Sequence, residues 1–384
     1  MRVPIDGFTT PGFEDVAVAF RASFESERMG AAVCCYLHGK CVIDLWGGMA
    51  DARNEVPWSA YTVGVIFSCT KGLMSILAAQ LGEEGLLDYD APVARYWPEF
   101  AAAGKADVRV RHLLNHQAGL SAPRLDLTTD DILDWNRVVG VLAAQAPLWP
   151  LGQGYAYHAI THGWLVGEVL RRASGRAISE LFADKIADPL RASAWIGLPD
   201  HARGRVSHMV VGPTLAEQTQ AGATTPSDWL RRAMTLGGAL PATLVEADAG
   251  FNDPRLWGAE IPGAGGIASA HALARIWSAT VWQTGGVRLL RPDMVGRATQ
   301  EETSGAPVFD VPPPWPRWGM GFQLDSDARR YLTPTGFGHD GAGGQVAFAE
   351  PELGLGFAYV TNLMDGAGDT RATSVVDAIR AMGQ

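Results

Sequence analysis

Both ends of the chain carry the same pattern, a helix beside a pair of β-prone runs, and this feature most constrains the fold. The β-prone runs are separated in pairs by short turns and cover residues 31–37, 41–46, 344–349 and 355–361. Apolar residues at helical spacing precede the first pair, over 13–24, and follow the second pair, over 375–382. Hairpins with flanking helices at both termini predict one antiparallel sheet built from the two ends, with the middle of the chain inserted between them.

The middle of the chain has a mostly helical pattern that glycines and prolines interrupt, and it shows no internal repeat. We therefore expect the 384 residues to form a single domain of the α+β class in two lobes. The α/β lobe would comprise about 1–85 and 261–384, and the mainly helical lobe would comprise about 86–260. A site between the two lobes would draw residues from both.

Composition excludes several classes of function. Hydrophobic residues make up 47% and charged residues 19%, as in folded soluble proteins. A net charge of -10 and a pI near 5.4 give no electrostatic basis for binding nucleic acid. The sequence has no apolar run of the roughly 18 residues that a membrane span needs, and its first residues do not resemble a signal peptide. These features predict a cytoplasmic protein without membrane or nucleic-acid partners.

The cysteines are too irregularly spaced for a metal site. They are Cys34, Cys35, Cys41 and Cys69, and none belongs to a known ligand pattern. We expect them to behave as small buried hydrophobic residues in a reducing compartment, without a disulfide scaffold.

A Ser-x-x-Lys pair supplies the first sign of chemistry. Ser68 and Lys71 lie at the start of an apolar pattern that continues to Leu81 and that Gly85 can close as a helix. Positions i and i+3 share a helix face, so the amine of Lys71 can reach the hydroxyl of Ser68. The positive end of the helix dipole and burial both lower a lysine pKa, which would make Lys71 a base for Ser68. The competing interpretation is that Ser68 only caps the helix.

Three segments in order resemble the serine β-lactamases, the penicillin-binding proteins and the esterases related to class C β-lactamases, known as family VIII. They read VIFSCTKG at 65–72, GLLDYDAPV at 85–93 and RHLLNHQAGL at 111–120. The resemblance covers nearly the whole chain, and it implies the β-lactamase/transpeptidase-like fold with the active site between the lobes. It also implies a serine hydrolase that forms an acyl-enzyme on Ser68 and needs no cofactor.

The family's second and third motifs have counterparts that imply further site residues. Tyr157 matches the tyrosine of Tyr-x-Asn and would share the proton relay with Ser68 and Lys71, although Tyr155 is a rival two residues earlier. The strand motif matches His339-Asp340-Gly341, whose three residues would line the substrate pocket. By the same resemblance, the oxyanion hole would consist of the backbone N–H groups of Ser68 and Ala342. Candidates for an apolar pocket wall are Trp149, Trp164, Trp315 and, as the one we assign to substrate binding, Trp318.

Two departures from the family pattern point to a particular substrate class. Ala159 stands where penicillin-recognising members have an asparagine, and its side chain cannot form a hydrogen bond. In those members the lysine or histidine of the third motif helps to hold a carboxylate, but His339 is only partly charged near neutral pH. We therefore predict a carboxylesterase for short acyl esters. The alternatives are a β-lactamase or D-alanyl-D-alanine peptidase, an acyltransferase, and a penicillin-binding relic that only binds ligand. Sequence does not define the oligomeric state.

Other motif matches carry little weight. His112-x-x-x-His116 and His158-x-x-x-His162 have the spacing of zinc ligands but lack the glutamate of His-Glu-x-x-His, so helix capping or packing explains them better and no metal site is predicted. Gly-x-Ser-x-Gly and Walker-type loops are absent from the sequence. The turn at 263–266 resembles the family's glycine turn beside the active site.

Overall fold

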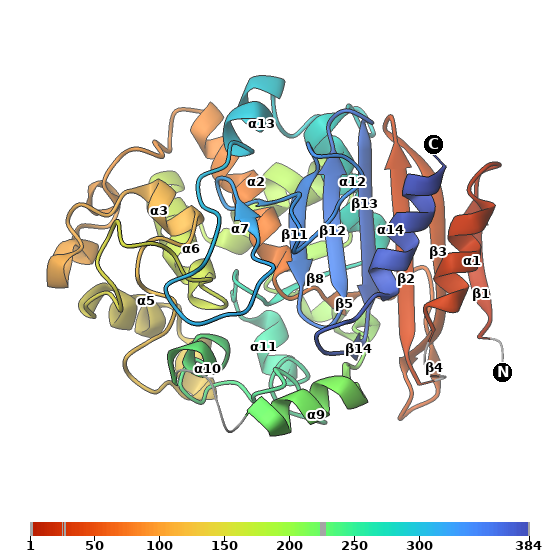
Figure 1. Cartoon of the computed structure of the whole chain (residues 1–384), viewed down its shortest axis with the longest axis horizontal. Helices are drawn as coiled ribbons and strands as arrows, with labels where there is room; N and C mark the ends of the chain where they lie inside the picture. Colours follow the sequence, from red (N-terminus) through yellow and green to blue (C-terminus); the bar gives the residue numbers. More distant parts are fainter. Residues whose placement is uncertain (1–2, 25, 27, 223–227, 383–384) are drawn as a thin grey trace.

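A large antiparallel sheet from the two ends of the chain forms one side of the molecule in the computed structural model, which describes residues 3–24, 26, 28–222 and 228–382 (Figure 1). Its strand order is β1-β3-β2-β13-β12-β11-β10-β9, and β4 pairs with β3. The strands are β1 (Ile5–Thr9), β2 (Gly30–Leu37), β3 (Lys40–Asp51), β4 (Val56–Pro57), β9 (Arg317–Trp318), β10 (Gln323–Leu324), β11 (Phe337–Gly341), β12 (Gln345–Glu350) and β13 (Leu355–Thr361).

The two ends of the chain meet where β2 pairs with β13, from Leu37 opposite Leu355 to Ala31 opposite Thr361. This pairing confirms the sheet predicted from the sequence. The strand β3 is longer than predicted, because its last residues pair with β1 and β4. Gly48 lies inside this strand, and a Cβ at this position would lie 2.1 Å from the carbonyl oxygen of Met29. The glycine therefore permits a close approach of two backbones inside the sheet.

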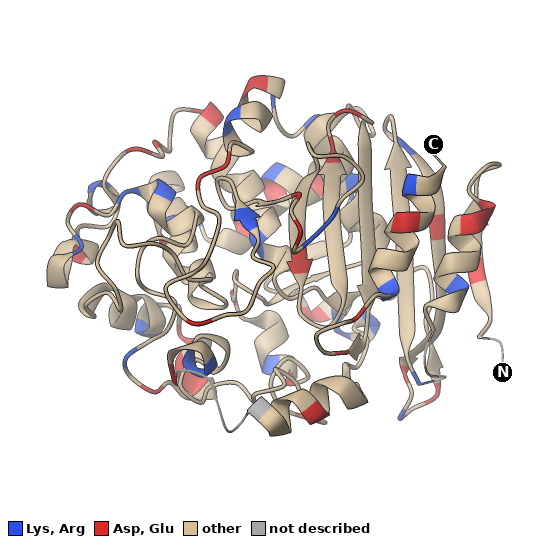
Figure 2. Ribbon diagram, viewed as in Figure 1, with Lys and Arg blue, Asp and Glu red and all other residues tan. Residues whose placement is uncertain are grey.

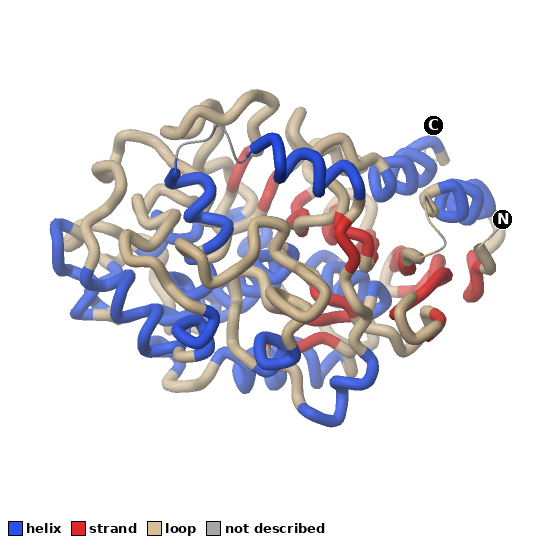
Figure 3. Tube along the Cα trace, turned by 90° about the horizontal axis from the view of Figure 1, so that it is seen from below, coloured by secondary structure: helices blue, strands red, loops and turns tan. Residues whose placement is uncertain are grey.

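Helices cover both faces of the sheet. On the outer face, α1 (Glu14–Ala22) and α14 (Arg371–Ala381) lie side by side near the two termini, as Figures 1 and 3 show. On the inner face lie α2 (Cys69–Glu83) and α12 (Ala270–Val281). Alternate residues of β13 therefore enter two cores: Phe357 packs on the outer side and Ala358 on the inner side. Every residue of β13 is buried, as expected for a strand covered on both faces.

The middle of the chain is mainly helical and lies against the inner side (Figure 1). Its helices are α3 (Val110–Leu114), α4 (Thr129–Leu133), α5 (Trp135–Ala144), α6 (Thr161–Ser174), α7 (Ile178–Phe182), α8 (Asp188–Leu190), α9 (Pro213–Gly222), α10 (Asp228–Thr235) and α11 (Pro254–Gly258), and α13 (Pro292–Ala298) follows α12. A small sheet joins β5 (Gly64–Val65), β8 (Gly266–Ala268) and β6 (Ala194–Ile196), while β7 (Val210–Val211) pairs with β14 (Leu363–Met364).

Charged residues of both signs are interspersed over the molecule, as Figure 2 shows. Many form ion pairs across elements; Arg111, for example, contacts both Asp90 and Glu302. Within the described part of the chain, no helix combines the length and apolar character needed to cross a membrane.

Candidate active site

Ser68 lies at the sharp junction between β5 and α2. The residue before it, Phe67, has a φ of 43°, a left-handed conformation that costs energy for a side chain of this size. The hydroxyl of Ser68 forms no capping hydrogen bond with the helix that begins at Cys69. The capping interpretation is therefore wrong, and the strained turn leaves the hydroxyl free to point elsewhere.

The amine of Lys71 is buried beside that hydroxyl. Its Nζ lies 2.9 Å from Oγ of Ser68 and donates to two backbone carbonyls, those of Ala159 at 2.6 Å and Gly263 at 2.7 Å. The lysine has no exposed surface. Burial lowers the pKa of Lys71 well below its usual value, while the nearby Cys69 opposes this effect.

This set of partners suits a neutral amine. A neutral Nζ has two hydrogens, which the carbonyls of Ala159 and Gly263 accept, and one lone pair, which can accept the hydroxyl hydrogen of Ser68. The uncharged amine is thus fully hydrogen-bonded in the geometry that proton transfer from Ser68 requires.

Tyr157 completes a three-residue group. Its hydroxyl is hydrogen-bonded to Ser68, and the amine of Lys71 lies 4.9 Å from its ring centroid. Burial raises the pKa of Tyr157, so the phenol stays protonated near neutral pH. The rival Tyr155 is occupied elsewhere, since its hydroxyl donates to the carbonyl of Gly305 at 2.8 Å. The structure therefore brings Tyr157, and not Tyr155, to Ser68 and Lys71.

The strand β11 runs against the turn that carries Ser68. A Cβ on Gly341 would lie 2.4 Å from the carbonyl oxygen of Ile66, so only glycine permits this approach. Ala342 follows directly and lines the same cavity as Ser68. Within the described residues, the backbone N–H groups of Ser68 and Ala342 donate to no protein acceptor. Two free donors beside the hydroxyl can stabilise a carbonyl oxygen that gains negative charge.

His339 and Asp340 occupy the same strand with different environments. The Nδ1 of His339 lies 2.7 Å from the carbonyl oxygen of Asp340, and burial lowers the pKa of His339 to about 3. His339 is therefore neutral near neutral pH, whereas the sequence led us to expect a partial charge. The carboxylate of Asp340 accepts a hydrogen bond from Arg329 at 2.6 Å. Arg329 itself does not line the cavity that holds Ser68.

The hydroxyl of Ser68 opens into a cavity of about 380 Å³, within the range of small-ligand sites. Its wall is mainly apolar and includes Phe67, Ile160, Met234, Leu244, Ala264 and Pro316, together with Trp318 and the strand residues described above. The described lining residues include no lysine or arginine. The cavity therefore favours an uncharged, largely apolar ligand.

Of the four tryptophans considered from the sequence, only Trp318 lines this cavity. Its ring stacks on Tyr157 with centroids 5.4 Å apart and an interplanar angle of 13°. The other three lie elsewhere. Trp164 is a fully buried core residue, Trp149 packs against Phe309, and Trp315 donates to the carbonyl of Val311.

Sequence reasoning missed the two carbonyls that hold Lys71. The carbonyl of Gly263 reaches Lys71 because the turn that carries it packs very closely against the start of α6. A Cβ on Gly163 in this helix would lie 1.9 Å from the backbone nitrogen of Gly263. Ala159 contributes through its backbone although its side chain is inert. Only the glycine-rich turn at 263–266 gave a signal, as a border of the site.

A group of three buried histidines packs next to Tyr157. The ring of His116 lies 4.9 Å from Tyr157, and His158 and His162 lie within 5.6 Å of His116. Burial lowers the pKa of all three, so they are neutral packing partners. The Nδ1 of His112 instead accepts from the backbone of Arg109 in a helix cap, which is the role expected from the sequence.

The fold and this group of residues define a protein of the β-lactamase and penicillin-binding-protein class. The model of the Beta-lactamase family matches residues 14–381, and the chain belongs to that family. It is 36% identical over 372 residues to the esterase/beta-lactamase LipL of Mycobacterium tuberculosis, covering 93% of this chain and 82% of the relative.

Solved structures give the same result. A crystal structure of a family VIII carboxylesterase matches with a TM-score of 0.87 and 36% identity, over 99% of this chain and all of the other. A penicillin-binding protein homologue from Caulobacter crescentus matches with a TM-score of 0.86 and 35% identity, over the same shares of the two chains.

Proposed function

We propose that this protein is a serine carboxylesterase that hydrolyses short-chain acyl esters through an acyl-enzyme on Ser68. The observation that carries the proposal is the contact between Ser68 and a buried Lys71 at the end of an apolar cavity. The likeness to an esterase/beta-lactamase and to a family VIII carboxylesterase supports the same chemistry.

In the first half of the reaction, the hydroxyl of Ser68 attacks the ester carbonyl while its proton moves to Nζ of Lys71. The N–H groups of Ser68 and Ala342 stabilise the negative charge on the carbonyl oxygen. Tyr157 lies close enough to Ser68 to pass the proton on to the departing alcohol.

In the second half, water attacks the acyl-enzyme and the same groups return the proton. A water molecule takes the place of the alcohol and gives one proton to the neutral amine of Lys71. Tyr157 passes its own proton to Oγ of Ser68 and is reprotonated by Lys71, and the acid leaves. No step needs a cofactor.

The absence of a cation from the described cavity wall favours esters over lactams. Lactam and D-alanyl substrates carry a carboxylate that must be bound, whereas Arg329 does not line the cavity and is paired with Asp340. A neutral His339 cannot replace it. A simple ester needs neither contact.

The test is turnover of nitrophenyl esters of increasing acyl length by the wild type and by Ser68→Ala. We expect hydrolysis to be fastest for short chains and to disappear in Ser68→Ala. Faster hydrolysis of a chromogenic cephalosporin than of nitrophenyl butyrate would identify a β-lactamase instead. Transfer of the acyl group to an added alcohol in preference to water would identify an acyltransferase, and an inert protein would identify a ligand-binding relic.

A cytoplasmic location is part of this proposal, because all four cysteines are free and a reducing compartment keeps cysteines in that state. Cell fractionation with an activity assay tests this location.

A further inference from the structure

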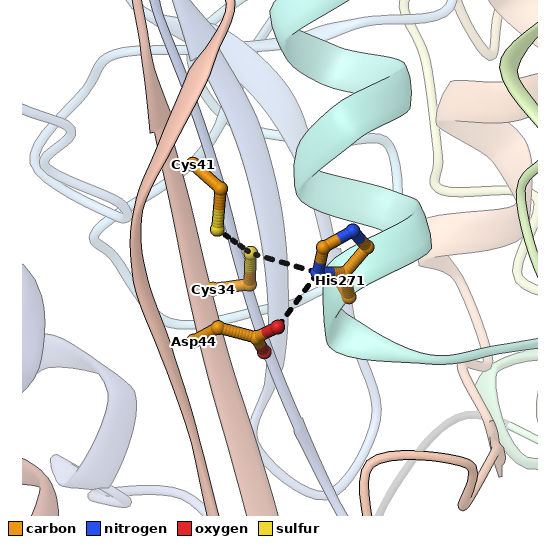
Figure 4. A group of neighbouring side chains, drawn as sticks. All are labelled: Cys34, Cys41, Asp44 and His271. Carbon is orange, nitrogen blue, oxygen red and sulfur yellow. Dashed lines mark hydrogen bonds and ion pairs between the residues drawn. The ribbon is translucent and has the colours of Figure 1, made fainter. Parts of the chain in front are cut away.

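A second cluster of reactive side chains lies outside the cavity, between the β2–β3 hairpin and α12. Figure 4 shows Cys34, Cys41 and Asp44 on the hairpin facing His271 in the first turn of the helix. One ligand atom from each residue lies within 4.8 Å of all the others. None of the four lines the cavity at Ser68. The geometry points to a zinc site whose ligands are two cysteines, one histidine and one aspartate.

Two of the distances between these atoms are close to those of tetrahedral zinc. Two sulfurs bound to zinc at about 2.3 Å lie about 3.8 Å apart, and a sulfur and a nitrogen lie about 3.5 Å apart. The sulfurs of Cys34 and Cys41 are separated by 3.7 Å, and Sγ of Cys34 is 4.0 Å from Nδ1 of His271. Only Nδ1 and the carboxylate of Asp44 are closer than a shared metal requires, at 2.7 Å, because a proton joins them.

An irregularity in the hairpin brings the ligands together. Cys41 and Asp44 are three residues apart, so they would point to opposite faces of a regular strand. The register instead shifts: Cys34 is opposite Asp44, Tyr36 is opposite Cys41, and Val42 is the extra residue. This β-bulge turns Cys41 to the face that carries Cys34 and Asp44, as bulges beside functional sites do.

The same register argues against a disulfide. Cys34 and Cys41 are diagonal neighbours, not directly opposite. Such positions place Cα atoms about 7 to 8 Å apart, at or beyond the roughly 7 Å limit for a disulfide without backbone movement. A metal ion between the sulfurs bridges the gap that a covalent bond cannot.

The surroundings supply the remaining features of a metal site. Nε2 of His271 lies 2.9 Å from the hydroxyl of Tyr36, which would orient the imidazole so that Nδ1 faces the metal. His271 and Asp44 keep 41% and 20% of their side-chain surface exposed, so an ion can enter from solvent. Two thiolates and a carboxylate around Zn²⁺ leave one net negative charge, which suits the positive end of α12.

Zinc binding here exchanges protons and no electrons. The ion would displace one proton from each thiol, and at Nδ1 of His271 it would replace the proton shared with Asp44. With all four positions filled by protein, the metal would hold the hairpin to α12 and would activate no water. Cys34 and Cys41 are then more than the inert hydrophobic residues expected from the sequence, whereas Cys35 remains a core residue.

The test is metal titration of the full-length protein after treatment with a chelator. We expect one Zn²⁺ per chain, and with Co²⁺ the charge-transfer band of a thiolate ligand and the intense visible bands of tetrahedral cobalt. Saturation to about a hundred times the dissociation constant should raise the melting temperature by roughly 3 °C.

Variants assign the ligands. Cys34→Ser, Cys41→Ser and His271→Ala should each abolish stoichiometric binding, and Tyr36→Phe should weaken it by roughly tenfold. The matched control is Cys35→Ala, which removes a thiol from the other face of β2 and should bind zinc as the wild type does. Binding that survives the three ligand variants would overturn the inference. So would loss of two thiols to a disulfide on mild oxidation of the metal-free protein with no measurable zinc binding.

Discussion

At the residue scale, a comparison of the buried lysines Lys71 and Lys105 shows which hydrogen-bond partners allow a lysine to act as a base. Lys105 donates to three carbonyls, those of Ala102, Ala143 and Gln145, and only an ammonium has three hydrogens to give. Lys71 contacts two carbonyls and the hydroxyl of Ser68, which can itself donate. Both are fully buried, so the difference lies in one partner atom. Burial alone therefore does not produce a catalytic lysine.

Replacing each lysine by methionine separates the two roles. Lys71→Met should lower kcat by about 10² to 10⁴, the usual contribution of a general base. Lys105→Met should leave kcat of the folded enzyme nearly unchanged and lower the melting temperature, because carbonyls lose their donors. Steady-state kinetics and thermal unfolding on the same preparations check both. Equal kcat in the two variants would remove Lys71 from the mechanism.

The pH profile should show the lowered pKa of Lys71. Only the neutral amine accepts a proton, so kcat/KM is expected to fall as the pH drops through the pKa of Lys71 in the folded enzyme. Because burial lowers that pKa, the midpoint should lie well below the usual lysine value of about 10.4. His339 has a pKa of about 3 and is neutral throughout this range, so His339→Asn should keep the same midpoint. A midpoint that moves with His339 would contradict this assignment.

The two tyrosines provide the third comparison at this scale. Tyr157→Phe keeps the ring that stacks on Trp318 and removes the hydroxyl beside Ser68. We expect a loss in kcat of about 10² or more with little change in KM. Tyr155→Phe loses only a hydrogen bond to Gly305 and should retain kcat. Rates for the two variants under identical conditions decide between them.

The sequence predicts the catalytic residues that act through their side chains, but not those that act through backbone atoms. Ser68, Lys71 and Tyr157 act through side chains, and their spacing is visible in a motif. The carbonyls of Ala159 and Gly263 act through backbone atoms that every residue has. Their role depends on how closely two segments pack, and a sequence records this only indirectly, as small residues.

At the scale of elements, glycine determines how closely β11 approaches the turn that holds Ser68. The hairpin runs were predictable from β-prone residues, but the short β1 and the bulge at Val42 were not, since both depend on pairing with a partner strand. Gly341 is the point of closest contact, because any side chain there would collide with the carbonyl of Ile66. The position of the Ala342 N–H depends on this contact.

Gly341→Ala should therefore impair the oxyanion donors without touching the proton relay. Moving β11 away displaces the N–H of Ala342, and loss of one such donor costs about 10² to 10³ in kcat. The control is Gly140→Ala in the middle of α5, where an added Cβ meets nothing within 4 Å. That change should stabilise the protein by about 0.5 to 1 kcal/mol at unchanged kcat. Wild-type kcat in Gly341→Ala would remove Ala342 from the oxyanion hole.

At the scale of the whole molecule, the sheet separates a core that supports the site from a core that only supports the sheet. The outer core joins α1 and α14 and includes Phe20, whose ring meets Tyr359 of β13 edge to face with centroids 6.2 Å apart. The inner core holds α2 and the described helices of the middle segment. The mirrored ends of the sequence predicted this arrangement, because each end carries one helix and two strands. The lobe boundaries near residues 85 and 260 stay a prediction.

Stability and activity should consequently separate across the sheet. Phe20→Ala removes a fully buried ring from the outer core, a loss of about 3 to 5 kcal/mol. For a chain of this length, that corresponds to a fall of about 4 to 6 °C in melting temperature. The control Val18→Ala, on the same helix but 62% exposed, should change neither stability nor rate. Well below the transition, kcat/KM of Phe20→Ala should equal that of the wild type, because Ser68 and its partners lie beyond the other face of the sheet. A parallel loss of activity at that temperature would mean that the outer core positions the site as well.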